Sequence, residues 1–283
     1  MRLDGHRLVI DALTKGLQPL HVLLTDRAID APLGPDLLWQ LTNGLSLRSS
    51  GVPGMPAVPD TVENAHHQRI TMVSEKLLLA VQEDVTSSQG VLAIFERPKV
   101  TVTDAPFADA KKQKQPQEQL TVILDAVTDP GNLGMIVRAA CGLGATAIVS
   151  TPGSCDAWSP KALRASAGAS LALPMQEEAW DSAGMAALLG TEAGAHAQAQ
   201  AQVLLADSAA AAGAVAYDQI DYTRPTVLII GGEAFGPSAA ARAIARRTTV
   251  GIPLAGGQES LNAASAASII LAEAARQRRA AAR

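Results

Sequence analysis

The chain has 283 residues, of which 48% are hydrophobic, 18% charged and 3% aromatic, and its formal net charge is −4. This composition predicts a globular protein with a sizeable core rather than a disordered chain. The low aromatic content argues against a base-stacking platform for single-stranded nucleic acid. Two cysteines without a C-x-x-C pair fit a reducing compartment and give neither a disulfide framework nor a zinc site. No apolar run approaches the length that spans a membrane, and Met1–Leu20 shows no signal peptide.

The negative charge is concentrated in one segment. Residues 176–224 contain seven Asp and Glu and one Arg, whereas residues 121–175 and 225–283 together contain ten Lys and Arg against six Asp and Glu. Net acidity by itself disfavours nucleic-acid binding. The rest of the C-terminal half is mildly basic, so the overall charge does not exclude it.

Residues 1–97 have the pattern of a small α/β domain. The apolar spacing and turn residues predict a helix, a strand, a helix capped by Ser74 and a strand, at Leu3–Gly16, Pro19–Asp26, Val73–Gln82 and Gly90–Glu96. A Gly- and Pro-rich loop is expected at 49–60.

Residues 98–119 are predicted to be a linker, because Asp104–Gln119 is polar, charged and contains proline. Lys111, Lys112 and Lys114 are interpreted as solvated linker residues in preference to RNA contacts, since short charge runs are usually solvated.

From Leu120 onward the pattern alternates between strands and helices. The predicted strands are TVILDAV, TAIVS, TVLIIGG and TTVGIPL, and helices are expected at 131–143, 160–167, 237–246 and from 260 to the C-terminus. This alternation predicts a mostly parallel sheet with helices on both faces. Glu192–Val215 is low in complexity and is interpreted as an insertion without chemistry.

Three loops at the ends of apolar strands carry the candidate chemistry, because a rigid sheet can hold such loops while leaving backbone groups free. The first, DPGNLGMIVRAA, places Asn132 in a turn and Arg138 in the following helix. A capped turn with a surface arginine is the alternative reading.

The second loop is GGEAFGPS. Gly231 and Gly232 would let a ligand approach the backbone. Glu233 follows them and could equally be an ordinary exposed acid.

The third loop is IPLAGGQESLNAASAA. Ile252 and Leu254 end a strand, and Ser260, Leu261 and Asn262 begin the last helix, with Ser260 as a possible N-cap. Between the first two loops lies SPKALRASAGA, where Lys161 and Arg164 share a helix face that either grips RNA phosphate or is simply hydrated.

In order and spacing, these segments resemble the signature motifs of the SpoU (TrmH-like) RNA ribose methyltransferases of the SPOUT class. The resemblance is close over residues 120–283 and loose over residues 3–97, where GHRLV opens a domain similar to the ribosomal-protein-like substrate-binding module of rRNA-modifying members. Many relatives carry Asn at the position of Gly232, and often Val at that of Ala263.

The resemblance implies an α/β fold in which the C-terminal segment of a parallel sheet forms a deep trefoil knot. It also implies that S-adenosyl-L-methionine is the cofactor, held at Gly231, Gly232, Ile252, Leu254, Ser260 and Leu261. The implied catalytic residues are Asn132, Arg138, Glu233 and Asn262. Arginine is a poor general base, so whether Arg138 acts as a base or as an electrostatic clamp stays open.

The expected function is therefore 2′-O-methylation of a ribose in RNA, with rRNA favoured over tRNA. A homodimer is implied, and neither a metal nor a membrane is expected. The compartment would be the cytoplasm in a bacterium and the mitochondrion in a eukaryote. A catalytically silent ribosome assembly factor is one alternative. A Rossmann-type oxidoreductase is another, although GLGATA at 142–147 lacks the third glycine of its fingerprint.

Overall fold

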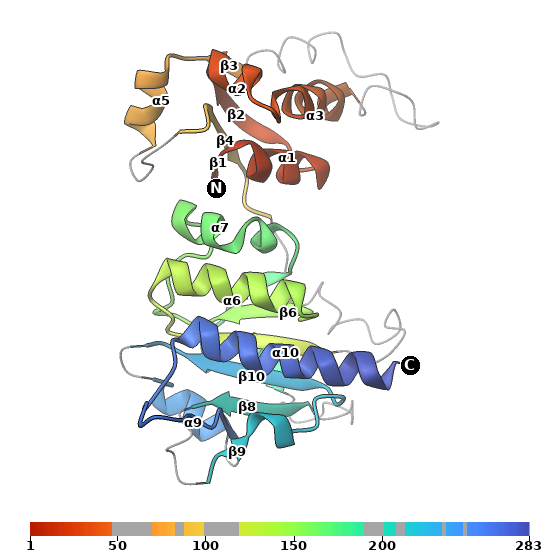
Figure 1. The fold of residues 1–283 in the computed structure, drawn as a ribbon, viewed down its shortest axis with the longest axis vertical. Coiled ribbons are helices and arrows are strands. Elements are labelled where there is room, and N and C mark those ends of the chain that lie inside the picture. Colours follow the sequence, from red (N-terminus) through yellow and green to blue (C-terminus); the bar gives the residue numbers. More distant parts are fainter. Residues whose placement is uncertain are drawn as a thin grey trace. The chain divides into compact units, whose positions relative to one another are not determined.

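The computed structural model describes residues 1–46, 70–82, 88–98, 119–189, 201–207, 213–233, 236–245 and 248–282. The chain forms two compact units: Met1–Pro98 with Trp158–Leu171, and Lys99–Ala157 with Ala172–Arg283 (Figure 1). The predicted loop at 49–60 lies outside the described residues. So does nearly all of the predicted linker, including its three lysines.

The first unit contains a four-stranded sheet in the order β1-β4-β2-β3. Its strands are β1 (Arg2–Asp4), β2 (Pro19–Leu24), β3 (Ile70–Met72) and β4 (Val91–Phe95). Its helices are α1 (His6–Thr14), α2 (Asp26–Asp30), α3 (Gly34–Ser46), α5 (Glu75–Val81) and α7 (Pro160–Ser166), followed by a 3₁₀ turn at Ala169–Leu171. β2 pairs with β3 in parallel, and the other two pairings are antiparallel.

Most of the elements predicted for this unit are confirmed. The Ser74 hydroxyl accepts a hydrogen bond from the Leu77 amide at 3.3 Å and caps α5. Gly16 has a φ of +78°, which suits its predicted place after the first helix. That helix begins at His6 rather than Leu3, because Leu3 is fully buried and pairs with Ala93 in the sheet.

The segment 158–171 is part of the core of the first unit. The side chain of Leu163 on α7 is fully buried in a cluster with Leu8, Val9 and Phe95, and Trp158 and Leu171 pack against the same cluster. Residues 158–171 fall inside the segment 120–283 that was predicted to form the second domain. The apolar face of α7 is therefore buried among N-terminal residues.

The second unit contains a seven-stranded, entirely parallel sheet, which confirms the α/β prediction. Its strands are β5 (Leu120–Asp125), β6 (Ala147–Ser150), β7 (Met175–Glu177), β8 (Gln202–Ala206), β9 (Val215–Ala216), β10 (Thr226–Gly231) and β11 (Thr249–Gly251). The strand order is β7-β6-β5-β10-β8-β11-β9. The helices are α6 (Pro130–Gly142), α8 (Ala183–Leu189), α9 (Ala239–Ala245) and α10 (Ala263–Ala281), and a 3₁₀ turn lies at Tyr217–Gln219.

The interpretation of Glu192–Val215 as a plain insertion is wrong for part of that segment. Gln202–Ala206 forms β8, which lies between β10 and β11, and Leu204 and Leu205 are buried. Five residues of strand within an alanine-rich stretch give too short an apolar run to stand out from their surroundings.

Helices cover both faces of this sheet, as predicted (Figure 1). Ile123 and Ile229 face a cluster that includes Met185 of α8 and Ala241 of α9. Residues that alternate with them along the strands, such as Val122 and Leu228, are buried on the opposite face, because successive strand side chains point in opposite directions. α6 and α10 pack against each other, and α10 also packs against β10.

Among the described residues, no helix is both long and apolar enough to cross a membrane.

Candidate active site

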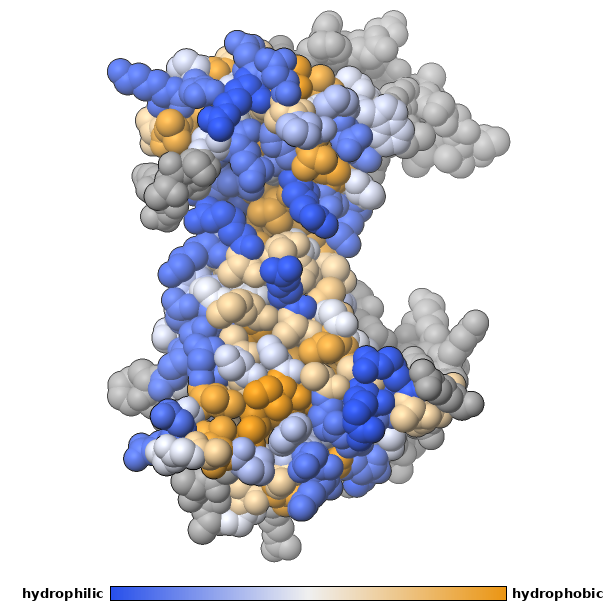
Figure 2. All heavy atoms as spheres, in the orientation of Figure 1, coloured by the Kyte–Doolittle hydropathy of each residue, from blue (hydrophilic) through white to orange (hydrophobic). Residues whose placement is uncertain are grey.

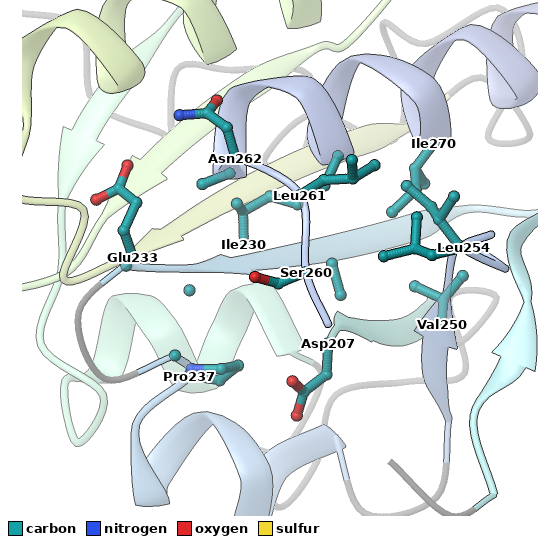
Figure 3. A pocket seen from close by; sticks show the side chains of 17 residues that line it. Asp207, Ile230, Glu233, Pro237, Val250, Leu254, Ser260, Leu261, Asn262 and Ile270 are labelled. Carbon is teal, nitrogen blue, oxygen red and sulfur yellow. The ribbon is translucent and has the colours of Figure 1, made fainter. Parts of the chain in front are cut away.

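A cavity of about 400 Å³ lies at the carboxyl end of β10, between the loop that follows this strand, the loop that follows β11, and the start of α10. Figure 3 shows Val250, Leu254 and Ile270 gathered at one end and Glu233 and Asn262 at the other. The cavity therefore has an apolar end and a polar end, within the size range of small-molecule sites. Clefts at the carboxyl ends of parallel strands are common ligand sites.

The structure brings together most of the residues that the sequence singled out. All six candidate cofactor residues line this cavity, and so do two of the four candidate catalytic residues. The first six are Gly231, Gly232, Ile252, Leu254, Ser260 and Leu261; the other two are Glu233 and Asn262.

Gly232 has no space for a side chain. Its amide donates to the Asp125 carbonyl at 2.9 Å, and a Cβ atom on it would lie 2.3 Å from the carbonyl oxygen of Ala126. A contact that short would force the backbone apart. Glycine at position 232 thus coincides with a close backbone approach in this chain.

Asn132 joins the second and third loops through its side chain. Its Nδ2 donates to Glu233 Oε1, and its Oδ1 accepts from Asn262 Nδ2 at 3.0 Å. Asn262 Oδ1 in turn accepts from the backbone amides of Ala264 and Ser265 at 3.0 and 3.2 Å. Because backbone amides can only donate, they fix the orientation of the Asn262 amide, and this fixes that of Asn132. We call Glu233, Asn132 and Asn262 the polar relay.

Local sequence explains the position of two members of this relay. Asp129 caps α6 by accepting from the Asn132 amide at 2.8 Å, and Pro130 occupies the first helical turn, where no amide hydrogen is needed. Asn262 is the N-cap of α10. The reading of Ser260 as the N-cap is therefore wrong, because the helix starts later, at Ala263.

Arg138 does not line the cavity. It lies on the exposed side of α6, six residues after Asn132. Six residues advance a helix by about 9 Å and leave the two side chains about 120° apart around its axis. Arg138 and Asn132 therefore point in different directions within one chain.

Asp207 also lines the cavity and is not among the residues predicted from the sequence. It directly follows β8, and its Oδ2 pairs with Arg242 Nη1 of α9 at 2.5 Å. An acid after a short apolar run, QVLLA, was the available signal. Recognising that run as a strand would have placed Asp207 at the edge of the sheet that holds the other loops.

Lys161 and Arg164 do not share a common role. Arg164 Nη1 lies 3.4 Å from Oδ2 of Asp4, a carboxylate that is only 5% exposed and also pairs with Arg2 at 3.3 Å. Arg164 thus forms an ion pair inside the first unit, whereas Lys161 is exposed.

Cys155 lies beside the loops without the properties of a nucleophile. Its pKa is raised to about 11, chiefly by burial and also by the negative charge of Asp129. At neutral pH it is therefore a thiol, and thiols are poor nucleophiles. Among the described residues, no group of three or more His, Cys, Asp or Glu is arranged to hold a metal ion.

Comparison with known proteins identifies this arrangement. Two curated relatives are the 23S rRNA (uridine(2479)-2′-O)-methyltransferase of Streptomyces viridochromogenes and the mitochondrial rRNA methyltransferase 3 of Homo sapiens. The first is 36% identical over 186 residues, covering 63% of this chain and 60% of the relative. The second is 32% identical over 235 residues, covering 69% of this chain and 55% of the relative. The chain thus spans less than two thirds of the length of these relatives.

Two groups of crystal structures are similar over nearly the whole chain. The SpoU methyltransferase AviRb from Streptomyces viridochromogenes has a TM-score of 0.74 at 26% identity, covering 99% of this chain and 90% of AviRb. The AdoMet-bound rRNA methyltransferase from Sinorhizobium meliloti has a TM-score of 0.68 at 27% identity, covering 97% and 86%. Residues 119–272, more than half of the chain, match the family model of the SpoU rRNA Methylase family. The chain belongs to the SpoU rRNA methylase family.

Proposed function

We propose that this protein transfers a methyl group from S-adenosyl-L-methionine to the ribose 2′-hydroxyl of a nucleotide in RNA. The observation that carries the proposal is the convergence of the second and third motif loops on one cavity, with Asn132 of the first loop joined to both of them through the polar relay. A 2′-O-methyltransferase among the curated relatives and AdoMet-bound structures among the similar folds support it.

S-adenosyl-L-methionine, when bound, supplies a methyl group attached to a positively charged sulfonium sulfur. This sulfur is a good leaving group, because it departs as a neutral thioether. The ribose 2′-oxygen forms the new bond to the methyl carbon, the sulfur–carbon bond breaks toward sulfur, and the hydroxyl proton is released. The protein then has mainly to align the reactants and to exclude water.

The residues of the cavity suit this cofactor. Val250, Leu254 and Ile270 offer an apolar surface for an adenine ring, and the backbone of Gly231 and Gly232 lines the same cavity. The carboxylate of Glu233 lies at the polar end, where it favours a positive sulfonium centre.

We propose that Arg138 contacts the RNA substrate. Arginine is a hydrogen-bond donor and a poor general base, so holding a phosphate and stabilising a developing alkoxide suit Arg138 better than proton abstraction. Because it points away from Asn132 within one chain, we propose that a second copy of the chain brings Arg138 to the site.

A homodimer formed through α6 and α10 would supply that second copy. Met135 on α6 is 46% exposed and Leu261, next to α10, is 38% exposed. Figure 2 shows apolar surface over the first half of α10. Met135 and Arg138 are three residues apart on α6 and both exposed, so a second copy packed on this face would also meet Arg138. We further propose the trefoil knot of the family for the residues after β11, because Leu254 and residues 260–262 line the cavity beside the β10 loop.

For the rest of the chain, we propose that residues 1–97 form a domain that selects the RNA. Residues 98–119 form the linker between the domains, and residues 120–283 form the methyltransferase domain. The substrate is rRNA in preference to tRNA, in line with the names of the curated relatives. The compartment is the cytoplasm in a bacterium or the mitochondrion in a eukaryote.

Methyl transfer from labelled S-adenosyl-L-methionine to unmodified rRNA and tRNA tests the proposal, with nucleoside mass spectrometry of the product. We expect a 2′-O-methylated nucleoside in rRNA that disappears with Arg138→Ala, while Arg279→Ala, an exposed arginine of α10, keeps the activity. Cofactor binding without transfer to any RNA would favour the silent assembly factor, and absence of cofactor binding would overturn the assignment.

A further inference from the structure

Asp125 is a buried carboxylate just outside the cavity. It ends β5, is 1% exposed, and is absent from the cavity lining. In the sheet it lies next to Gly231, the last residue of β10. An ionised carboxylate so deeply buried requires several hydrogen-bond donors.

Three donors from three different loops meet this carboxylate. Oδ1 accepts from the indole of Trp180 at 3.0 Å and from the hydroxyl of Thr151 at 3.3 Å. Oδ2 accepts from the backbone amide of Ser238 at 2.6 Å. Within the described residues, no lysine or arginine forms an ion pair with it, so neutral donors hold it.

Asp125 contacts both ends of the loop that follows β10. The Asp125 carbonyl accepts from the amide of Gly232 at 2.9 Å, and the carboxylate accepts from Ser238. Between these two amides lie Glu233, Gly236 and Pro237, which all line the cavity. One residue therefore fastens both ends of the loop that follows β10.

We propose that Asp125 is a positioning residue that sets the affinity for S-adenosyl-L-methionine by holding this loop in its binding conformation. The inference rests on the proposed function of the cavity. A loop already held in the bound conformation loses less conformational freedom when the ligand binds. Glu233 is also held by Asn132, so the catalytic geometry can re-form once the ligand is bound.

Asp125→Asn tests this role. The side-chain amide keeps the size of the carboxylate. Its NH2 group must face either the Ser238 amide or the Trp180 indole, both of which are donors, so one of these two hydrogen bonds is lost. We expect Kd and KM for S-adenosyl-L-methionine to rise about tenfold and kcat to stay within about threefold, because binding and not the transition state is affected. Hydrogen exchange at the amides of Gly232 and Ser238 should accelerate.

Thr121→Val is the matched control. Thr121 is fully buried in the same strand, and its hydroxyl has no hydrogen-bond partner among the described residues. This variant should keep wild-type Kd, KM and exchange rates. Equal Kd for Asp125→Asn and Thr121→Val would overturn the proposal.

If Asp125→Asn fails to fold, a second pair of variants tests whether the contact between Asp125 and the Ser238 amide sets the cofactor affinity. Ser238→Pro removes the amide hydrogen and the hydroxyl, whereas Ser238→Ala removes only the hydroxyl that caps α9. We expect the Kd increase in the proline variant alone, and equal affinities would count against the role of Asp125. If the wild-type protein itself fails to bind S-adenosyl-L-methionine, the proposed function fails, and hydrogen exchange at the two loop amides still tests the loop contacts.

Discussion

The side-chain amide of Asn262 donates to Oδ1 of Asn132, 130 residues earlier in the chain, at 3.0 Å. The same Asn262 side chain caps α10 through its own oxygen. The start of the last helix is thereby linked to the start of α6, and the helix cap determines how the amide of Asn132 faces Glu233.

Substitutions of Asn262 separate these two roles. Asn262→Asp keeps an oxygen that caps α10 but places a second oxygen, an acceptor, against the acceptor Oδ1 of Asn132. Asn262→Ala loses both the cap and the contact with Asn132. We expect kcat to fall at least about tenfold in both variants, because the relay is broken. Only the alanine variant should lose stability, by about 1 kcal/mol. Thermal unfolding and steady-state methyl transfer measure the two effects, and an aspartate variant with full activity would show that the relay is dispensable.

Gly232→Ala should disrupt the cavity. The new Cβ would lie 2.3 Å from the Ala126 carbonyl oxygen, so the β10 loop must shift. We expect destabilisation of about 1–3 kcal/mol, as for other overpacked sites, and loss of calorimetric binding of S-adenosyl-L-methionine.

Gly142→Ala is the control for that experiment. Gly142 is the last residue of α6, and a Cβ there meets no atom within 4 Å. Its replacement should leave binding intact and stabilise the helix by up to about 1 kcal/mol. Unchanged affinity in Gly232→Ala would show that the loop tolerates a side chain.

Arg164→Ala should lower stability without a specific effect on RNA affinity. The substitution leaves the buried carboxylate of Asp4 with Arg2 and Gln82 as its partners. Arg164 is about one third exposed, so the expected loss is only about 1 kcal/mol. Denaturant unfolding of Arg164→Ala, Asp4→Asn and the double variant should show coupling between the two residues.

Lys161→Ala provides the comparison, since Lys161 is exposed on the same helix. Filter binding of rRNA fragments measures the RNA affinity of both variants. A loss of RNA affinity in Arg164→Ala at unchanged stability would contradict the structural role of Arg164.

Tyr222→Phe should stabilise the protein. The ring is fully buried, and its hydroxyl has no hydrogen-bond partner among the described residues. Burial raises the pKa of Tyr222 above its ordinary value of 10.0, and the charge of Glu273 adds to the shift. Removing an unsatisfied hydroxyl should raise Tm by about 2–4 °C, which corresponds to about 1 kcal/mol.

The advantage of this variant should grow at alkaline pH. Below pH 10 tyrosine is neutral in both the folded and the unfolded state. Above pH 10 only the unfolded state ionises freely, so the wild-type protein loses stability as the pH rises and the phenylalanine variant does not. Melting curves between pH 8 and pH 11 measure the difference, and a constant gap in Tm would contradict the assignment.

Local patterns were sufficient to predict β5 and β10, which are neighbours in the sheet. β5 and β10 are continuous apolar runs buried on both faces, and the glycine loop after β10 marks a ligand edge. The hydrogen bond between Asn132 and Glu233 joins residues 101 positions apart, and no local pattern carries such information. Their grouping came from the family resemblance alone.

The failures of prediction have equally definite causes. β8 is hidden because alanine-rich sequence flanks both sides of its five residues. The helix at 160–167 was predicted correctly, but its sequence does not reveal which core its side chains enter, and Leu163 enters the core of the first unit. Asp207 was missed together with its strand.

The contribution of residues 158–171 to the first unit limits how the two units can be recombined. The chain passes between the units after Pro98, after Ala157 and after Leu171. A chimera joined near residue 98 would keep the N-terminal segment of one parent and take Trp158, Leu163 and Leu171 from the other. Exchanging the first unit between relatives therefore requires transplanting two segments at once, and these segments are expected to diversify together in evolution.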